Sequence, residues 1–194
     1  MALPQIKQDD RFTYADYMTW DDDQRWELID GQAFCMTPAP ARLHQEWLGN
    51  LFSKFHVFLA GKPCKVYISP FDVRFSEHPD ASDEDIDTVV QPDMVVFCDK
   101  SKLDDRGAKG APDLLVEILS PGTSKRDITI KFELYQRHGV KEYWILYPNE
   151  KLLQLYRLGE DKKYGSPQVF GPGESVQVAM LGELEISLDD LFSE

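Results

Sequence analysis

The chain contains few cysteines, and their spacing is not that of a metal site. Its 194 residues include three, Cys35, Cys64 and Cys98, which lie far apart and form no CxxC or Cys/His pattern. A zinc site is therefore a weak interpretation. We expect instead three small buried thiols that are reduced, as in a cytoplasm.

Long hydrophobic runs are also missing. No apolar stretch approaches the roughly 20 residues that a transmembrane helix needs. Residues 1–7 lack the apolar core of a secretory signal peptide. We therefore expect a cytoplasmic protein that is not inserted in a membrane.

Positive charge is scarce. The chain has 21 lysines and arginines against 34 aspartates and glutamates, which gives a net charge of −13 at pH 7. This balance argues against nucleic-acid binding through a broad basic face, although it does not exclude a nuclease. Much of the acid is concentrated in residues 76–87, and several basic residues gather in later loops, which is typical of solvated segments. These basic residues are Lys100, Lys102, Arg106, Lys109, Lys125 and Arg126.

The common nucleotide-binding and hydrolase motifs are absent. The sequence has no GxGxxG, GxxxxGK[ST], HExxH or GxSxG pattern, no internal repeat and no segment that resembles a linker. Hydrophobic residues make up 42% of the chain and aromatic residues 12%, which is enough for one substantial core. We expect a single domain over residues 1–194.

Hydrophobic residues recur with the period of a strand in some segments and of a helix in others, which predicts mixed secondary structure. Residues 26–36 predict a β-hairpin that turns at Asp30–Gly31, and an apolar stripe predicts a helix over residues 41–60 that packs on a core. This order of elements predicts an α/β or α+β fold with a mixed sheet flanked by helices. The other expected elements are a helix at 13–20, strands at 65–69, 71–75, 93–97, 114–119, 142–147 and 152–158, a loop at 98–112, a helix at 124–138, and short strands with a helical turn in the tail.

One acidic residue lies in the middle of the most apolar predicted strand. Glu117 faces the same side as Leu115 and Leu119, because side chains alternate along a strand. A buried carboxylate is costly unless it is paired or coordinated. Glu117 is therefore either a metal ligand or one half of a buried ion pair with a lysine or an arginine.

A second acid, Asp93, opens the strand at 93–97, one loop before the Glu117 strand. Two carboxylates on neighbouring strands are suited to Mg²⁺ or Mn²⁺, which binds carboxylate oxygens together with water and substrate phosphate. The alternative is that Asp93 caps a neighbouring backbone at the end of its strand.

Lys131 lies on the predicted helix that follows the Glu117 strand, on the same face as Asp127 and Tyr135. Because this helix begins directly after the strand, the lysine could overhang both acids. There it could orient a water molecule or stabilise a phosphoryl transition state. The alternative for a lysine at the border of an apolar stripe is to extend its ammonium group into solvent.

Two further residues are candidates for the same site. Glu27 lies in the first hairpin and could be a supporting or second-metal carboxylate, or a surface residue. His44 lies near the start of the helix at 41–60 and could contact phosphate or assist proton transfer. A purely structural role is the commoner one for a single histidine.

Together these segments resemble the PD-(D/E)XK nuclease superfamily, and most closely its Uma-two branch of restriction-type endonucleases. The resemblance covers about residues 26–158, and the order and spacing of its segments are more specific than any single one. The matching segments are Glu27–Gly31 with His44 after it, Gln91–Asp93, Val116–Pro121, Lys131 with Tyr135, and Gly139–Ile145.

The resemblance implies that Asp93, Glu117 and the Ile118 carbonyl bind the metal. In the superfamily the lysine usually stands two residues after the second acid, where this chain has Leu119. Lys131 matches the helical position to which the lysine has moved in this branch. The resemblance also implies a restriction-endonuclease-like core, with a central mixed sheet flanked by helices, and a homodimer.

These observations predict a DNA endonuclease that depends on Mg²⁺ or Mn²⁺. Asp93 and Glu117 bind the metal in this interpretation, and Lys131 positions or activates water with Glu27 and His44 in support. Two alternatives stay open. The negative net charge and the presence of Leu119 where the superfamily usually has its lysine favour a catalytically silent binding module with the nuclease fold. A closed pocket would favour a metal-dependent phosphoesterase that acts on a smaller substrate.

Overall fold

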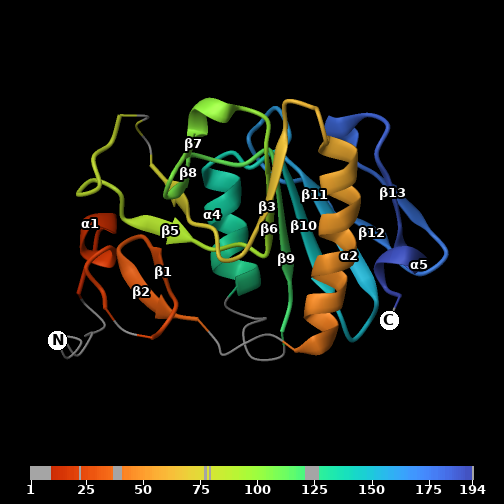
Figure 1. Cartoon of the computed structure of the whole chain (residues 1–194), viewed down its shortest axis with the longest axis horizontal. Helices are drawn as coiled ribbons and strands as arrows, with labels where there is room; N and C mark the ends of the chain where they lie inside the picture. The colour runs from red at the N-terminus through yellow and green to blue at the C-terminus, as the bar shows by residue number, and fades with distance from the viewer. Residues whose placement is uncertain are drawn as a thin grey trace.

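Within the residues that the structure describes, a mixed six-stranded sheet, the central sheet, lies at the centre of the molecule (Figure 1). The computed structural model describes residues 10–193 except 22, 37–40, 77, 79 and 121–126. Strands β9 and β10 run parallel, and the other neighbours run antiparallel. In spatial order the strands are β12 (Gln168–Phe170), β11 (Leu152–Arg157), β10 (Glu142–Tyr147), β9 (Leu114–Ile118), β6 (Met94–Phe97) and β3 (Lys65–Ile68).

A second sheet, the lateral sheet, contains the N-terminal hairpin and appears on the left of Figure 1. Its strands β4 and β8 run parallel, whereas the pairs β1–β2, β1–β5, β4–β5 and β7–β8 run antiparallel. In spatial order its strands are β2 (Gln32–Cys35), β1 (Trp26–Ile29), β5 (Thr88–Val90), β4 (Val73–Phe75), β8 (Gly107–Lys109) and β7 (Leu103–Asp104).

Strand β9 sends alternate side chains to the two faces of the central sheet, because the side-chain period of a strand is two residues. Its even-numbered residues from Leu114 to Ile118 belong to the hydrophobic cluster beneath α2 (Arg42–Leu59). Leu115 belongs to the cluster that faces the lateral sheet. Glu117 therefore lies on the lateral-sheet side, together with Leu115, as the sequence predicts.

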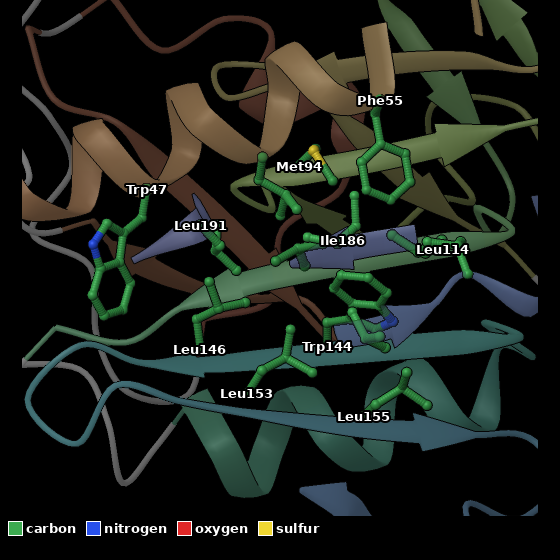
Figure 2. Close-up of a cluster of buried hydrophobic side chains, with 14 of the residues drawn as sticks. Trp47, Phe55, Met94, Leu114, Trp144, Leu146, Leu153, Leu155, Ile186 and Leu191 are labelled. Atoms are coloured by element: carbon green, nitrogen blue, oxygen red, sulfur yellow. The ribbon is translucent and has the colours of Figure 1, made fainter. Parts of the chain in front are cut away.

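The larger hydrophobic cluster fills the space between α2 and the central sheet (Figure 2). Trp47 and Phe55 project from α2 toward the strands, where Trp144 lies fully buried. Burying one such side chain contributes about 1.5–3 kcal/mol. The C-terminal elements complete this cluster through Ile186 and Leu191. These elements are β13 (Ser175–Gln177), a 3₁₀ turn at Ala179–Leu181, β14 (Glu185–Ser187) and α5 (Leu188–Leu191).

The other face of the central sheet is covered by α4 (Phe132–Arg137), which lies between the two sheets in Figure 1. A wide π turn at Asp127–Lys131 leads directly into this helix. Tyr135 of α4 packs in one cluster with Phe75 of the lateral sheet and Ile145 of the central sheet. The end of the π turn and the start of α4 therefore lie over the face of β9 that carries Glu117.

The predicted hairpin is confirmed, and its turn is the one expected. Asp30 and Gly31 have φ angles of 50° and 74°, the left-handed conformation that Asp-Gly adopts in a tight hairpin turn. Thr13 caps α1 (Tyr14–Tyr17) with its side chain, and the helix is shorter than the expected 13–20.

Helix α2, predicted at 41–60, is confirmed, and its apolar stripe lies against the central sheet. Gln45 and Lys54 lie on its exposed side. In the part of the chain that the structure describes, no helix combines the length and the apolar character that crossing a membrane requires.

Two predictions of secondary structure need correction. The segment 98–112, predicted as a loop, contains a 3₁₀ turn at Lys100–Lys102 and strands β7 and β8. Strand β5 is also absent from the prediction, because strands of two or three residues depend on distant partners more than on a pattern of their own. The helix predicted at 124–138 is described from 127 onward and begins there as a π turn. Residues 124–126 of that prediction lie outside the described residues.

The prediction of three reduced, buried thiols is wrong. Cys64 and Cys98 form a disulfide, and Cys35 is exposed. The physical reason is the antiparallel pairing of β3 with β6, in which Lys65 lies opposite Phe97, so that the residues just beyond this pair meet. The contact is hidden in the sequence, because the two cysteines are 34 residues apart.

The approach of two lateral-sheet segments at Gly107 yields a stability prediction. Gly107 has a φ of +118°, and a Cβ atom there would overlap the carbonyl oxygen of Asp72. Gly107→Ala should therefore lower the free energy of unfolding by about 2 kcal/mol or more. Gly49→Ala is the matched control, because it lies in α2 with nothing near the new methyl group. It should raise that free energy by up to about 1 kcal/mol. Urea denaturation measures both, and equal effects would contradict the prediction.

Candidate active site

Glu117 is the centre of a buried hydrogen-bonded group. Its Oε1 accepts hydrogen bonds from Lys131 Nζ at 3.0 Å and from the Tyr135 hydroxyl at 2.7 Å. Lys131 and Tyr135 are four residues apart at the junction of the π turn and α4, so they approach Glu117 from the same side of the helix. All three side chains are buried.

Lys131 also connects the two sheets. Its Nζ donates to Glu27 Oε1 at 2.9 Å, and that oxygen also accepts the backbone N–H of Gln91 at 3.0 Å. Glu27 lies on β1 of the lateral sheet, whereas Glu117 lies on β9 of the central sheet. The ammonium group is therefore held between two carboxylates, which offset its cost of burial.

Asp93 lies on the other side of Glu117, directly before β6. Its Oδ2 accepts the backbone N–H of Ile118 at 2.7 Å, and its Oδ1 is 3.2 Å from His44 Nε2. His44 comes from the first turn of α2, so this helix contributes a side chain to the site as well as to the core.

The electrostatic environment of Glu117 is dominated by burial. The pKa of its carboxyl is raised to about 7. Burial and the charges of Asp93 and Glu27 raise this pKa, and the Lys131 ammonium lowers it. Burial also raises the pKa of Tyr135 well above its usual range, so its hydroxyl keeps its proton and donates to Glu117. Glu117 therefore lies between one favourable charge and two unfavourable ones.

His44 has a raised pKa although its burial opposes protonation. The hydrogen bond and the charge of Asp93 outweigh burial, and the charge of Glu117 and the Ile118 backbone add to them. Its buried Nδ1 has no hydrogen-bond partner among the described residues. The imidazole thus lies against Asp93, one of the two acids that the resemblance assigns to a metal ion.

The structure brings all of the predicted site positions into one connected group. Some contacts match the alternatives that the sequence leaves open: Glu117 is in a buried ion pair, and Asp93 accepts a backbone N–H. Lys131 does not extend into solvent, because only 5% of its side chain is exposed. In order of contact the group runs through Glu27, Lys131, Glu117, Ile118, Asp93 and His44.

Sequence reasoning missed the polar residues that hold the site residues in place. Tyr135 is recognised only as a neighbour of Lys131 on the helix, and Gln91 only as the residue before Pro92. Their signal in the sequence is weak, because a hydroxyl or an amide carries no charge that would make its burial conspicuous. Four-residue spacing from Lys131 is the one feature that points to Tyr135.

The basic loop residues are engaged elsewhere. Lys102 Nζ donates to the carbonyl oxygen of Ala111, and Arg106 is paired with Asp83. Lys125 lies outside the described residues. The described members of this set therefore give no support for a basic groove at the site.

The oxygen atoms near Glu117 suit a hard divalent cation. Glu117 Oε2 accepts no hydrogen bond from the described residues, since both of its bonds end on Oε1. The Asp93 carboxylate and the Ile118 carbonyl are the other oxygen donors that the resemblance assigns to the metal. Within the described residues no three His, Cys, Asp or Glu side chains are grouped to hold a metal. Mg²⁺ does not need three, because it usually binds one or two carboxylates with water and substrate phosphate.

A mixed sheet with acids at two adjoining strands, and a lysine from the following helix, defines a nuclease-like α/β protein. Residues 14–189 match the Uma2 (Uma-two) family, described as "Putative restriction endonuclease", and the chain belongs to this family. It is similar to a solved structure described as "a putative nuclease belonging to DUF820 from Anabaena variabilis". The similarity covers 93% of this chain and 97% of that one, with a TM-score of 0.73 and 22% identity. These matches confirm the predicted fold class. No curated protein matches the chain.

Removing the shared lysine should destabilise the protein in a pH-dependent way. Lys131→Met leaves Glu27 and Glu117 facing each other without a cation, which should cost about 3 kcal/mol at pH 8 in metal-free buffer. The loss should be smaller at pH 5. The pKa of Glu117 is already raised and rises further without Lys131, so the carboxyl is then protonated and neutral.

Urea denaturation at both pH values measures this difference. The control is Lys54→Met, which removes a pair with Asp190 whose side chains are 46% and 57% exposed. Such a pair contributes less than about 1 kcal/mol, and its loss should depend little on pH. An equal loss in both variants would show that the Lys131 ion pairs contribute no more than surface pairs.

Proposed function

We propose that this protein is a divalent-metal-dependent endonuclease that hydrolyses phosphodiester bonds in DNA. The observation that carries the proposal is that the two carboxylate oxygens of Glu117 differ. Oε1 accepts hydrogen bonds from Lys131 and Tyr135, and Oε2 is left for a ligand. Membership of a family described as restriction endonucleases supports the reaction class.

In this proposal Asp93, Glu117 and the Ile118 carbonyl would hold Mg²⁺ or Mn²⁺. When bound, such an ion stabilises negative charge on the phosphoryl group and lowers the pKa of an attacking water. The protein contributes a carboxylate that is held in one orientation, because Glu117 is fixed by hydrogen bonds from two side chains of one helix.

Lys131 would orient the attacking water or stabilise the developing charge through its ammonium group. Glu27 keeps the ammonium in position at 2.9 Å. His44 would contact phosphate or move a proton, since it lies against Asp93 and the hydrogen bond and charge of Asp93 raise its pKa although burial opposes this. We include in the proposal a single domain, supported by the composition, and a homodimer, supported by the resemblance. We also include a cytoplasmic location, supported by the family description.

One alternative is favoured by a specific observation. Lys131 is bonded to Glu27 and Glu117, and Asp93 is bonded to Ile118 and His44, so these charged groups already have partners within the protein. A catalytically silent module that keeps the nuclease fold and binds a partner would show the same contacts.

Plasmid nicking tests the proposed reaction. The wild-type protein should convert supercoiled plasmid to the open-circle form in Mg²⁺ or Mn²⁺, and EDTA should stop the reaction. Glu117→Gln and Lys131→Met should each lower the rate at least about 100-fold. Glu133→Gln, an exposed acid on α4, is the matched control and should cleave normally.

Calorimetry with Mn²⁺ separates the two functions. An endonuclease site should bind Mn²⁺, and Glu117→Gln should remove that binding while Glu133→Gln keeps it. Absence of both cleavage and Mn²⁺ binding in the wild type would refute the endonuclease and leave the silent module. Activity that survives in Lys131→Met would retain the metal site and exclude the proposed role of the lysine.

A further inference from the structure

Arg25 lies at the open end of the hairpin, beside the candidate site. It directly precedes β1, and its carbonyl oxygen accepts the N–H of Met36 at 2.8 Å, which extends the pairing of the hairpin by one step. Because Arg25 and Glu27 are two residues apart on this extended segment, their side chains lie on the same face.

The guanidinium group of Arg25 is bonded to two neutral residues that adjoin the site. Its Nε and Nη2 donate to Gln91 Oε1 at 3.0 and 2.5 Å, and Nη2 also donates to Ser69 Oγ at 2.5 Å. The backbone N–H of Gln91 is bonded to Glu27, and that of Ser69 is bonded to the carbonyl oxygen of Asp93. A single bridging residue therefore connects the guanidinium to each acid: Gln91 to Glu27, and Ser69 to Asp93.

Partly buried contacts fix the orientation of this arginine. The Gln91 amide directs its oxygen at Arg25, because its Nε2 donates to Asp72 Oδ1 at 2.8 Å and to the Tyr17 hydroxyl at 3.1 Å. The Tyr17 hydroxyl in turn donates to the same Asp72 oxygen at 3.4 Å. An exposed side chain is thus held in place by a partly buried network, which lowers the entropy lost when it binds a ligand.

Arg25 also differs from most other arginines in its lack of an acidic partner. No carboxylate among the described residues lies within ion-pair distance of it, and Asp72, which it influences electrostatically, is bonded to Gln91 and Tyr17. The scarcity of positive charge in this chain makes such an arginine conspicuous. The arginines that do pair with carboxylates are Arg42, Arg74, Arg106, Arg137 and Arg157.

We propose that Arg25 is the residue that binds a backbone phosphate of the DNA next to the scissile bond. The proposal rests on the proposed endonuclease function and names a substrate contact that the metal ligands do not provide. Nη1 of Arg25 donates to none of the described residues, and a planar guanidinium matches a phosphate better than a lysine does. The competing explanation is structural: Arg25 would only join the hairpin to Ser69 and Gln91.

Fluorescence anisotropy with a labelled DNA duplex tests the proposal separately from cleavage. Arg25→Gln should weaken DNA binding about tenfold and reduce the slope of log affinity against log salt by about one. Arg25→Lys should keep most of the salt slope. The control is Arg106→Gln, because Arg106 is half-exposed and paired with Asp83, and it should leave the affinity unchanged.

Two further measurements distinguish binding from structure. Arg25→Gln should keep the wild-type Mn²⁺ affinity and unfolding temperature, and in the nicking assay it should raise KM more than it lowers kcat. A lower unfolding temperature with an unchanged salt slope would overturn the proposal in favour of the structural role. The same affinity in Arg25→Gln and Arg106→Gln would overturn it as well.

A failure of the Arg25 proposal can be distinguished from a failure of the proposed function. A wild type that binds DNA without cutting it would refute the endonuclease, while the anisotropy of Arg25→Gln would still decide the phosphate contact. A wild type that cuts DNA with Arg25→Gln unaffected would refute only the contact. A wild type that does not bind DNA would overturn both.

Discussion

The ammonium group of Lys131, held between Glu27 and Glu117, is the interaction on which the site depends. It joins β1 of the lateral sheet to β9 of the central sheet at a point where apolar contacts alone would leave two carboxylates buried without a cation. Such a group is stable only as a complete set, because loss of any member leaves an uncompensated charge. The same bonds that secure the packing therefore also set the orientation of Glu117.

Much of the site was accessible from the sequence, because its charged members occupy positions where charge is costly. Glu117 between two leucines is such a position, and the order of Glu27, Asp93 and Lys131 around it carries the family resemblance. The hairpin and α2 follow from local patterns that their tertiary contacts reinforce. Local agreement of this kind makes an element predictable.

The remaining features depend on long-range pairing, which one sequence does not display. The Cys64–Cys98 disulfide follows from the register of β3 against β6, and strands β5, β7 and β8 exist through their neighbours. The π turn before α4 is not visible in the helical pattern, which predicts an ordinary helix there. Gln91 was missed for a different reason: its importance lies in five hydrogen bonds to four partners distant in sequence.

The hairpin carries Arg25 and Glu27 on one face of an extended segment, and β1 of this segment is held between β2 and β5 of the lateral sheet. Hydrogen bonds connect Glu27 to Lys131 and Lys131 to Glu117. One short stretch of backbone therefore sets the spacing between an exposed guanidinium and the buried group that orients Glu117.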